Sequence, residues 1–158
     1  SDRVLYCSVH EADSFPKTGW VDEIGTGAGR GYTLNAPLAA GSTIADYCYV
    51  FREVFVPALA RFRPDVLIVS AGQDALSDDA HGQMNLEPED YGVLTGMLID
   101  GTDLPLALTL EGGYGPSHGK AIAAIFGALS GKRFSPAERP LHQSTRRVVE
   151  ILKKVRFC

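Results

Sequence analysis

The sequence predicts an α/β domain of three layers, in which helices cover both faces of a mainly parallel sheet. Two apolar runs without alternation, at 65–70 and 104–110, are typical of parallel strands buried on both faces. Stretches with helical periodicity separate these runs, as β-α-β units require. The 158 residues are 45% hydrophobic and 22% charged, a composition that fits one globular domain with its own core.

The first half of the chain opens with a short expected strand at 3–9, which is rich in β-forming residues. Glycine, proline and acidic residues then dominate 10–37. This predicts a functional loop, because structureless connections above about 12–15 residues are uncommon in compact domains. Ser42 and Thr43 predict the start of a helix that runs to about residue 62, interrupted near Pro57 because proline lacks a backbone N–H.

The second half alternates strands and helices. The strand at 65–70 is followed by a helix at 88–99, which starts at a proline, and then by the strand at 104–110. A helix of small residues is expected at 116–129, and a basic amphipathic helix at 140–156.

The charge is distributed unevenly along the chain. Residues 1–131 hold seven basic and seventeen acidic residues, whereas 132–158 hold eight basic and two acidic ones. We therefore divide the chain into an acidic body at 1–131 and a basic helical extension at 132–158 that packs on it. A tail that binds nucleic acid is the alternative, but we expect no direct nucleic-acid partner.

Several protein classes are excluded by composition. No apolar run approaches the roughly 18–20 residues of a membrane span, so no membrane partner is expected. Cys7, Cys48 and Cys158 are widely spaced and form no C-x-x-C, which argues against a disulfide framework or a thiolate zinc site and favours the cytoplasm. The chain opens on a strand without an initiator Met, so we expect processing, a tag remnant or a piece of a longer protein.

Chemically useful side chains follow the three expected strands at their carboxyl ends, where open parallel sheets bind ligands. The first strand leads into His10, the second into Asp74, and the third into Tyr114 behind Gly112 and Gly113. We expect these residues to converge on one edge of the sheet. Each also has a purely structural alternative: His10 as a core histidine, Asp74 as a helix N-cap, and Tyr114 as a packed ring.

The glycine run at 25–31 is not a nucleotide-binding motif. A dinucleotide fingerprint needs G-x-G-x-x-G directly after a strand, and here the sixth position holds Arg30 or Tyr32. A P-loop lysine is also absent.

Four stretches carry a resemblance to a known family: VLYCSVH at 4–10, FPKTGWVDEIGTGAGRGYTLNAPL at 15–38, PDVLIVSAGQDAL at 64–76 and LTLEGGYG at 108–115. Together they resemble the zinc-dependent histone deacetylases, including the acetylpolyamine amidohydrolases and acetoin-utilisation proteins. Their order and spacing match from residue 3 to about residue 131. The resemblance implies a partial arginase/deacetylase-like domain that hydrolyses an acetyl amide.

The resemblance also implies roles for particular residues. A zinc-bound water attacks the amide in this family. Asp74 matches one of two aspartate ligands of the zinc, and Tyr114 matches the catalytic tyrosine that stabilises the oxyanion. Phe15 resembles one wall of the acyl tunnel, and Gly112 with Gly113 resembles the backbone that contacts the substrate.

A monovalent cation such as K⁺ is implied as well. Ser8 and the carbonyl of Val9 match a structural cation site of the family, and Tyr32 lies near a second one. The acetylated partner that the family implies is acetyl-lysine or an acetylpolyamine.

The chain departs from the family in one respect. The family's D-x-H zinc ligands and its histidine pair precede the strand at 3–9, and no D-x-H occurs in this sequence. The Asp-Asp-Ala-His stretch at 78–81 receives no ligand role from the resemblance. We therefore expect the C-terminal half of a deacetylase, with zinc weakly bound or absent and the isolated chain inactive.

This departure leaves two partners and three functions open. The chain pairs either with a missing N-terminal half or with a second copy, as a dimer through an unpaired strand edge at 4–9. The alternatives to a deacetylase fragment are a non-catalytic remnant that acts as a self-associating binding module, and an unrelated α/β binding domain.

Overall fold

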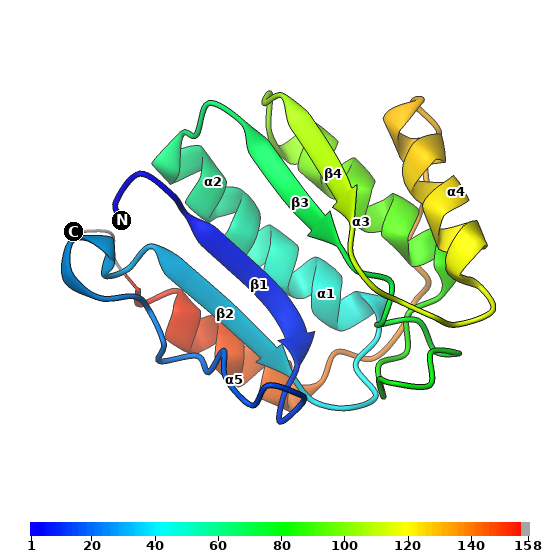
Figure 1. Ribbon diagram of the computed structural model, residues 1–158, viewed down its shortest axis with the longest axis horizontal. Coiled ribbons are helices and arrows are strands. Elements are labelled where there is room, and N and C mark those ends of the chain that lie inside the picture. The colour runs from blue at the N-terminus through cyan, green and yellow to red at the C-terminus, as the bar shows by residue number, and fades with distance from the viewer. Residues whose placement is uncertain (156–158) are drawn as a thin grey trace.

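The computed structural model describes residues 1–155 and contains four strands. They are β1 (Tyr6–Glu11), β2 (Thr33–Leu38), β3 (Leu67–Ala71) and β4 (Leu106–Leu110). β1 pairs in parallel with β2, and β3 pairs in parallel with β4, as two separate two-stranded sheets. All four strands point toward the same end of the molecule (Figure 1). The predicted parallel strands are therefore confirmed.

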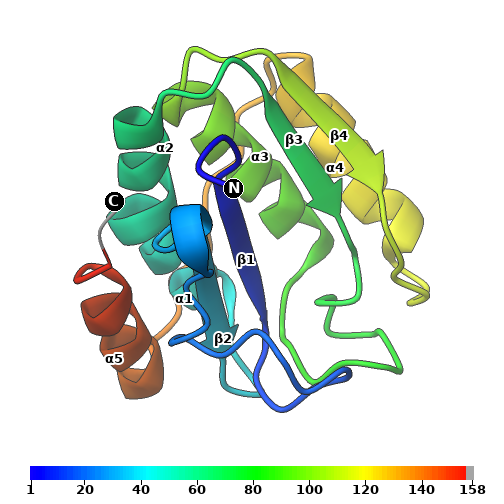
Figure 2. The ribbon, with the colours of Figure 1, turned by 60° about the vertical axis from the view of Figure 1, so that its left-hand side comes forward.

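The helices lie on one face of the strands, as the two views together show (Figures 1 and 2). They are α1 (Ile44–Val50), the π-helical segment η2 (Phe51–Phe55), α2 (Val56–Phe62), α3 (Pro88–Gly101), α4 (His118–Leu129) and α5 (Gln143–Leu152), while a 3₁₀ turn η1 (Gly27–Gly29) sits in the first long loop. The α/β class is confirmed, and residues 1–155 supply one of the two predicted helical layers. None of the helices in residues 1–155 is long and apolar enough to cross a bilayer.

The predicted helix at 43–62 forms, with the expected interruption. Its first turn is capped, since the Thr43 N–H donates to Asp46 Oδ2 at 3.0 Å. The N–H of Val56 donates to the carbonyl of Phe51, which makes a wide π turn directly before Pro57. Because Pro57 has no N–H, the regular α-helical ladder breaks at this point.

The prediction of a loop through residue 37 is wrong at its end, where β2 forms. Asn35 and Pro37 conceal the strand pattern. The Asn35 side chain is buried and donates to the carbonyls of Trp20 and Glu23 at 3.4 and 3.2 Å, so it anchors the preceding loop. The carbonyl of Leu38 accepts the N–H of Ala12, directly after β1, at 2.8 Å. Because backbone groups alternate along a strand, the nitrogen of Pro37 faces the opposite edge of β2, so a missing N–H is tolerated there.

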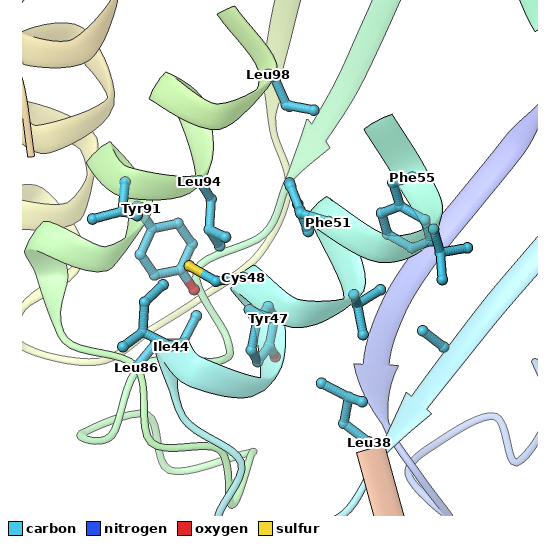
Figure 3. Packing of buried hydrophobic residues seen from close by; sticks show 14 of the residues in the cluster. Leu38, Ile44, Tyr47, Cys48, Phe51, Phe55, Leu86, Tyr91, Leu94 and Leu98 are labelled. Carbon is cyan, nitrogen blue, oxygen red and sulfur yellow. The ribbon is translucent and has the colours of Figure 1, made fainter. Parts of the chain in front are cut away.

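The core lies between the strands and the helices, where side chains of α1 and η2 meet those of α3 (Figure 3). Tyr47 and Phe51 come from the first group, and Leu94 and Leu98 come from the second; all four are buried. β1 and β3 therefore pack against the same group of helices, although the two strands do not pair with each other.

The C-terminal helix α5 packs on β2 and α1. Asp46, fully buried in α1, fixes its start. Oδ1 of Asp46 accepts the His142 N–H at 3.0 Å and the Thr145 hydroxyl at 2.7 Å, and Oδ2 lies 3.2 Å from Nδ1 of His142. One buried carboxylate therefore joins the first helix to the C-terminal extension.

Candidate active site at the carboxyl ends of the strands

A groove of about 360 Å³ opens at the carboxyl end of β1. Its lining includes four residues to which the resemblance gives a role, from three of the four matching stretches: Ser8, Val9, Phe15 and Asp74. His10, Glu11 and His81 also line it. The predicted convergence of the first two strand ends is confirmed.

His10 lies half-buried in this groove with both ring nitrogens bonded. Its Nε2 is 3.0 Å from the carbonyl of Gly19, which can only accept, so Nε2 carries the hydrogen. Nδ1 then accepts the Ser8 hydroxyl at 2.9 Å. Burial lowers the pKa of His10, although the Gly19 carbonyl and Glu23 act to raise it. The structure therefore favours the core-histidine alternative over a free base.

Asp74 stands exposed in the loop after β3, at the groove. No helix follows it, so the alternative of a helix N-cap is wrong. Burial, with the charge of Asp74 adding to it, raises the pKa of the Tyr47 hydroxyl beneath the groove. Asp74 is thus a carboxylate with open access to the groove.

The loop after β4 brings Tyr114 beside the groove but not into its lining. Gly112 and Gly113 have φ of +56° and +93°, so both use the left-handed region that favours glycine. The carbonyl of Gly112 accepts the N–H of Gln73 at 3.3 Å, which joins the loops after β3 and β4. The Tyr114 side chain is 78% exposed, so the alternative of a packed ring is wrong.

Asp79 is a buried residue without a site role in the sequence analysis, and it holds the Tyr114 loop in place. Its Oδ2 accepts the N–H groups of Tyr114 at 2.5 Å and Gly115 at 3.1 Å, and its Oδ1 accepts that of His81 at 2.8 Å. Desolvation acts to raise the pKa of Asp79, but these backbone donors outweigh it and lower that pKa.

His81 connects Tyr114 to the groove. The rings of His81 and Tyr114 meet edge to face with centroids 5.8 Å apart, and His81 itself lines the groove. The sequence indicates the hydrogen bonds of Asp79 to the Tyr114 loop only weakly. The acceptor carboxylate and the donor N–H groups lie about 35 residues apart, and every residue except proline carries such an N–H.

Tyr32 is not brought to the groove. It precedes β2 at the opposite end of the strands, where its carbonyl accepts the N–H of Tyr6 at 2.9 Å. Its ring packs edge to face on Phe62 at 5.8 Å.

The residues described here do not form a complete zinc site. Zinc sites in proteins use at least three His, Cys, Asp or Glu ligands. Within residues 1–155 no three such side chains cluster closely enough to hold a metal ion. Asp74 is available as one ligand, whereas Asp78 and Asp79 are occupied by the backbone of the 114–117 loop.

Comparisons with known proteins show the family to which this fold belongs. The family model for the histone deacetylase domain matches residues 1–129. The chain belongs to the histone deacetylase family. It is 35% identical to histone deacetylase HDA1 of Candida albicans over 163 residues and 37% identical to a probable deacetylase of Archaeoglobus fulgidus over 117 residues.

Solved structures of this family share the fold. The histone deacetylase Clr3 superposes with a TM-score of 0.88, and the HD domain of HDA15 with 0.85, each at 32% identity over 96% of this chain. The chain spans only 27% and 43% of those two structures, 19% of the Candida protein and 33% of the Archaeoglobus protein. It therefore corresponds to part of the length of its deacetylase relatives.

Proposed function

We propose that this chain is part of a zinc-dependent deacetylase that hydrolyses the acetyl amide of acetyl-lysine or an acetylpolyamine. The observation that carries the proposal is the meeting of three chain segments at one end of the strands. Asp74 and Phe15 line one groove there, and Tyr114 stands beside it on the ring of His81. An amide substrate needs these three kinds of group: a metal ligand, an apolar wall and a hydrogen-bond donor.

Asp74 is proposed as one zinc ligand, and the other ligands must come from outside residues 1–155. This assignment rests on the exposed carboxylate of Asp74 at the groove and on the lack of a three-ligand cluster among the described residues. A lone carboxylate binds zinc weakly, so the isolated chain is expected to be inactive.

Tyr114 is proposed to donate its phenol hydrogen to the oxyanion that forms on the amide carbonyl. Such a donor must be fixed in advance, because donors that reorganise during the reaction stabilise the oxyanion less. The Asp79 carboxylate supports this role, since it holds the Tyr114 backbone while the ring stays exposed.

The substrate is proposed to lie between Phe15 and the Gly112–Gly113 turn. The Phe15 side chain is 93% exposed at the groove, which leaves a ring free to contact an alkyl stem. A Cβ at Gly112 would meet nothing within 4 Å, so there is open space beside this backbone for a substrate.

A structural K⁺ site is proposed at Ser8 and the carbonyl of Val9, with Tyr32 near a second site. The Ser8 hydroxyl uses its hydrogen in the bond to His10, so the lone pairs of its oxygen remain available to bind a cation. Tyr32 lies at the opposite end of the strands, so the cation site near it would be separate from the one at Ser8.

The cytoplasm is proposed as the compartment of the protein. Cys7 and Cys48 are free thiols in the structure, and Cys158 lies outside the described residues. Burial raises the pKa of Cys7 to about 12 and that of Cys48 to about 11, so both remain protonated and unreactive. Free thiols suit a reducing compartment.

The proposal can be tested in a chimera. Residues 1–129 replace the matching segment of the Archaeoglobus deacetylase, and zinc content and hydrolysis of an acetyl-lysine peptide and of acetylspermidine are measured. We expect stoichiometric zinc and hydrolysis of one substrate class. Asp74→Asn should lose the zinc, whereas Asp100→Asn, at an exposed position near the end of α3, should keep it. A folded, zinc-loaded chimera without hydrolysis would contradict the proposal.

A further inference from the structure

The C-terminal helix α5 lies at the outer edge of the molecule, beside β2 and the first helix (Figures 1 and 2). It contacts β2, α1 and η2. The buried residues on its inner face are Thr145, Val149 and Leu152, none of which carries a charge. Because α5 is attached through this neutral face, its basic residues are left on the outer side of the helix.

The basic residues of α5 and of the turn that ends it form two rows. Arg146 and Lys153 are seven residues apart, and so are Arg147 and Lys154. Seven residues make about two helical turns, so each pair lies on one line along the helix. All four residues are exposed, and Glu150 is the only acidic residue of α5. The outer side of α5 therefore carries an excess of positive charge.

The neighbouring helix adds positive charge to this surface. The guanidinium groups of Arg52, in η2, and Arg146 lie 5.8 and 5.6 Å from the ring centroid of Tyr49 on α1. Glu53 pairs with Arg52 and also with Lys153, so three cations share one carboxylate. Like charges held this close repel one another, and a bound anion would relieve that repulsion.

Together these residues form one exposed basic patch, which consists of Arg52, Arg146, Arg147, Lys153 and Lys154. Five positive charges against the two carboxylates of Glu53 and Glu150 leave a net charge of +3. The side chain of Arg52 is 62% exposed and that of Lys153 is 46% exposed. The ion pairs within residues 1–155 involve neither Arg147 nor Lys154. The acidic body of the chain therefore does not neutralise the basic patch.

The positive surface continues beyond Arg52. Arg52 also lines a groove of about 520 Å³ between the helices and the segment after α4, and Lys132 and Arg133 line the same groove. Arg133 pairs with Asp100, whereas Lys132 lies over the ring of Phe134, 4.6 Å from its centroid. The cations are thus spread along a surface and do not converge on one point. This arrangement fits an anion with repeating charges better than a single small anion.

We propose that the basic patch binds the phosphate backbone of a nucleic acid. A duplex carries one negative charge per about 1.7 Å of its axis, so its phosphates can pair with cations at several spacings. An anionic membrane fits less well, because helices that lie on membranes insert their apolar face, and that face of α5 is buried against the body. This inference replaces the expectation from composition that the chain has no direct nucleic-acid partner.

The test is fluorescence anisotropy of the complete chain with labelled duplexes of about 20 base pairs, one of DNA and one of RNA. We expect both to bind at about 50 mM salt without a preference for sequence, because phosphate contacts do not read the bases. With about three phosphates neutralised, the logarithm of the binding constant should fall against the logarithm of the salt concentration with a slope of about −3. Binding should be roughly 40-fold weaker at about 200 mM salt.

Matched double variants separate the basic patch from other binding. Arg146→Gln with Arg147→Gln removes two charges without changing the buried face of α5, so the slope should fall to about −1 and the affinity at least about tenfold. Arg146→Lys with Arg147→Lys keeps the charges and should retain the slope. Lys17→Gln with Lys120→Gln removes two exposed charges elsewhere and should leave binding unchanged. The ¹⁵N amide spectrum of each variant shows that it is folded.

The same amide spectra locate the nucleic acid on the chain. Addition of either duplex should shift the amides of residues 146–154 and of Arg52, and should leave that of Asp74 unchanged. The proposal is overturned if neither duplex binds at about 50 mM salt, or if the Gln variant binds as well as the Lys17 and Lys120 control. It is also overturned if poly-glutamate or vesicles of anionic lipid bind as tightly as the duplexes.

Discussion

The carboxylate of Asp79 accepts the backbone N–H of Tyr114 at 2.5 Å, and this contact links the loops that follow β3 and β4. The same oxygen accepts the N–H of Gly115 at 3.1 Å. A side chain from the first loop thus sets the path of the second loop. The position of Tyr114 therefore depends on a buried carboxylate that holds its backbone, as well as on the contact of its ring with His81.

Asp79→Ala should destabilise the chain markedly, because it leaves three backbone N–H groups without their acceptor. Hydrogen bonds to charged groups contribute about 1.5–3 kcal/mol each, so we expect a loss of about 3 kcal/mol in the free energy of unfolding. The neighbouring Asp78→Ala is the control. Asp78 is exposed and accepts one N–H, from Ser117, so its loss should be about 1 kcal/mol or less. Urea denaturation measures both, and equal losses would refute this role for Asp79.

The same carboxylate should contribute to the acid sensitivity of the fold. Its pKa is lower in the folded chain than the usual unfolded value of about 3.9, so the folded state favours the ionised form. The resulting stability is present above about pH 4 and is lost as the pH falls through the folded pKa. Asp79→Asn should show a smaller loss of stability than the unmodified chain between about pH 4 and pH 2. Urea midpoints across this range measure it, and parallel curves would contradict it.

Two adjacent glycines should differ in their tolerance of alanine. Both have positive φ, so each substitution costs about 1–2 kcal/mol of backbone strain. A Cβ at Gly112 would meet nothing within 4 Å, whereas one at Gly113 would lie 2.6 Å from the backbone carbonyl carbon of Gln73. Gly113→Ala should therefore lose at least about 1 kcal/mol more than Gly112→Ala. Thermal or urea unfolding of the two variants compares them directly, and equal stabilities would show that the loops can separate without cost.

The sequence predicted the elements whose signals are local. The strands at 65–70 and 104–110 and the interrupted helix around Pro57 all appear within a few residues of their predicted bounds. β2 was missed because Asn35 and Pro37 break its apolar pattern, and both are accommodated by partners or edges that only the fold provides. The unpaired strand edge expected at 4–9 is present in the described residues, because β1 pairs there only with β2.

The candidate site was predictable only in part, for the same reason. Asp74 and Phe15 follow the rule that ligands gather at the ends of parallel strands, and they line one groove. Asp79 could not be identified as a residue that shapes the site. Its partners are backbone N–H groups, which leave no pattern of side chains in the sequence. His10 shows the opposite case: its position fits a catalytic base, but both nitrogens are bonded within the chain.

The last prediction concerns Tyr114→Phe in the Archaeoglobus chimera, where it removes only the phenol hydroxyl. The backbone contacts to Asp79 remain, so the fold and the zinc content should not change. Loss of one oxyanion donor typically lowers turnover by about 10²–10³, and we expect that drop in kcat with KM nearly unchanged. Tyr49→Phe is the matched control, because Tyr49 lies on α1 against Arg52, outside the groove lining. Steady-state hydrolysis of the acetylated substrate measures both variants. If Tyr114→Phe retained the full rate while the chimera remained active, Tyr114 would have no part in the chemical step.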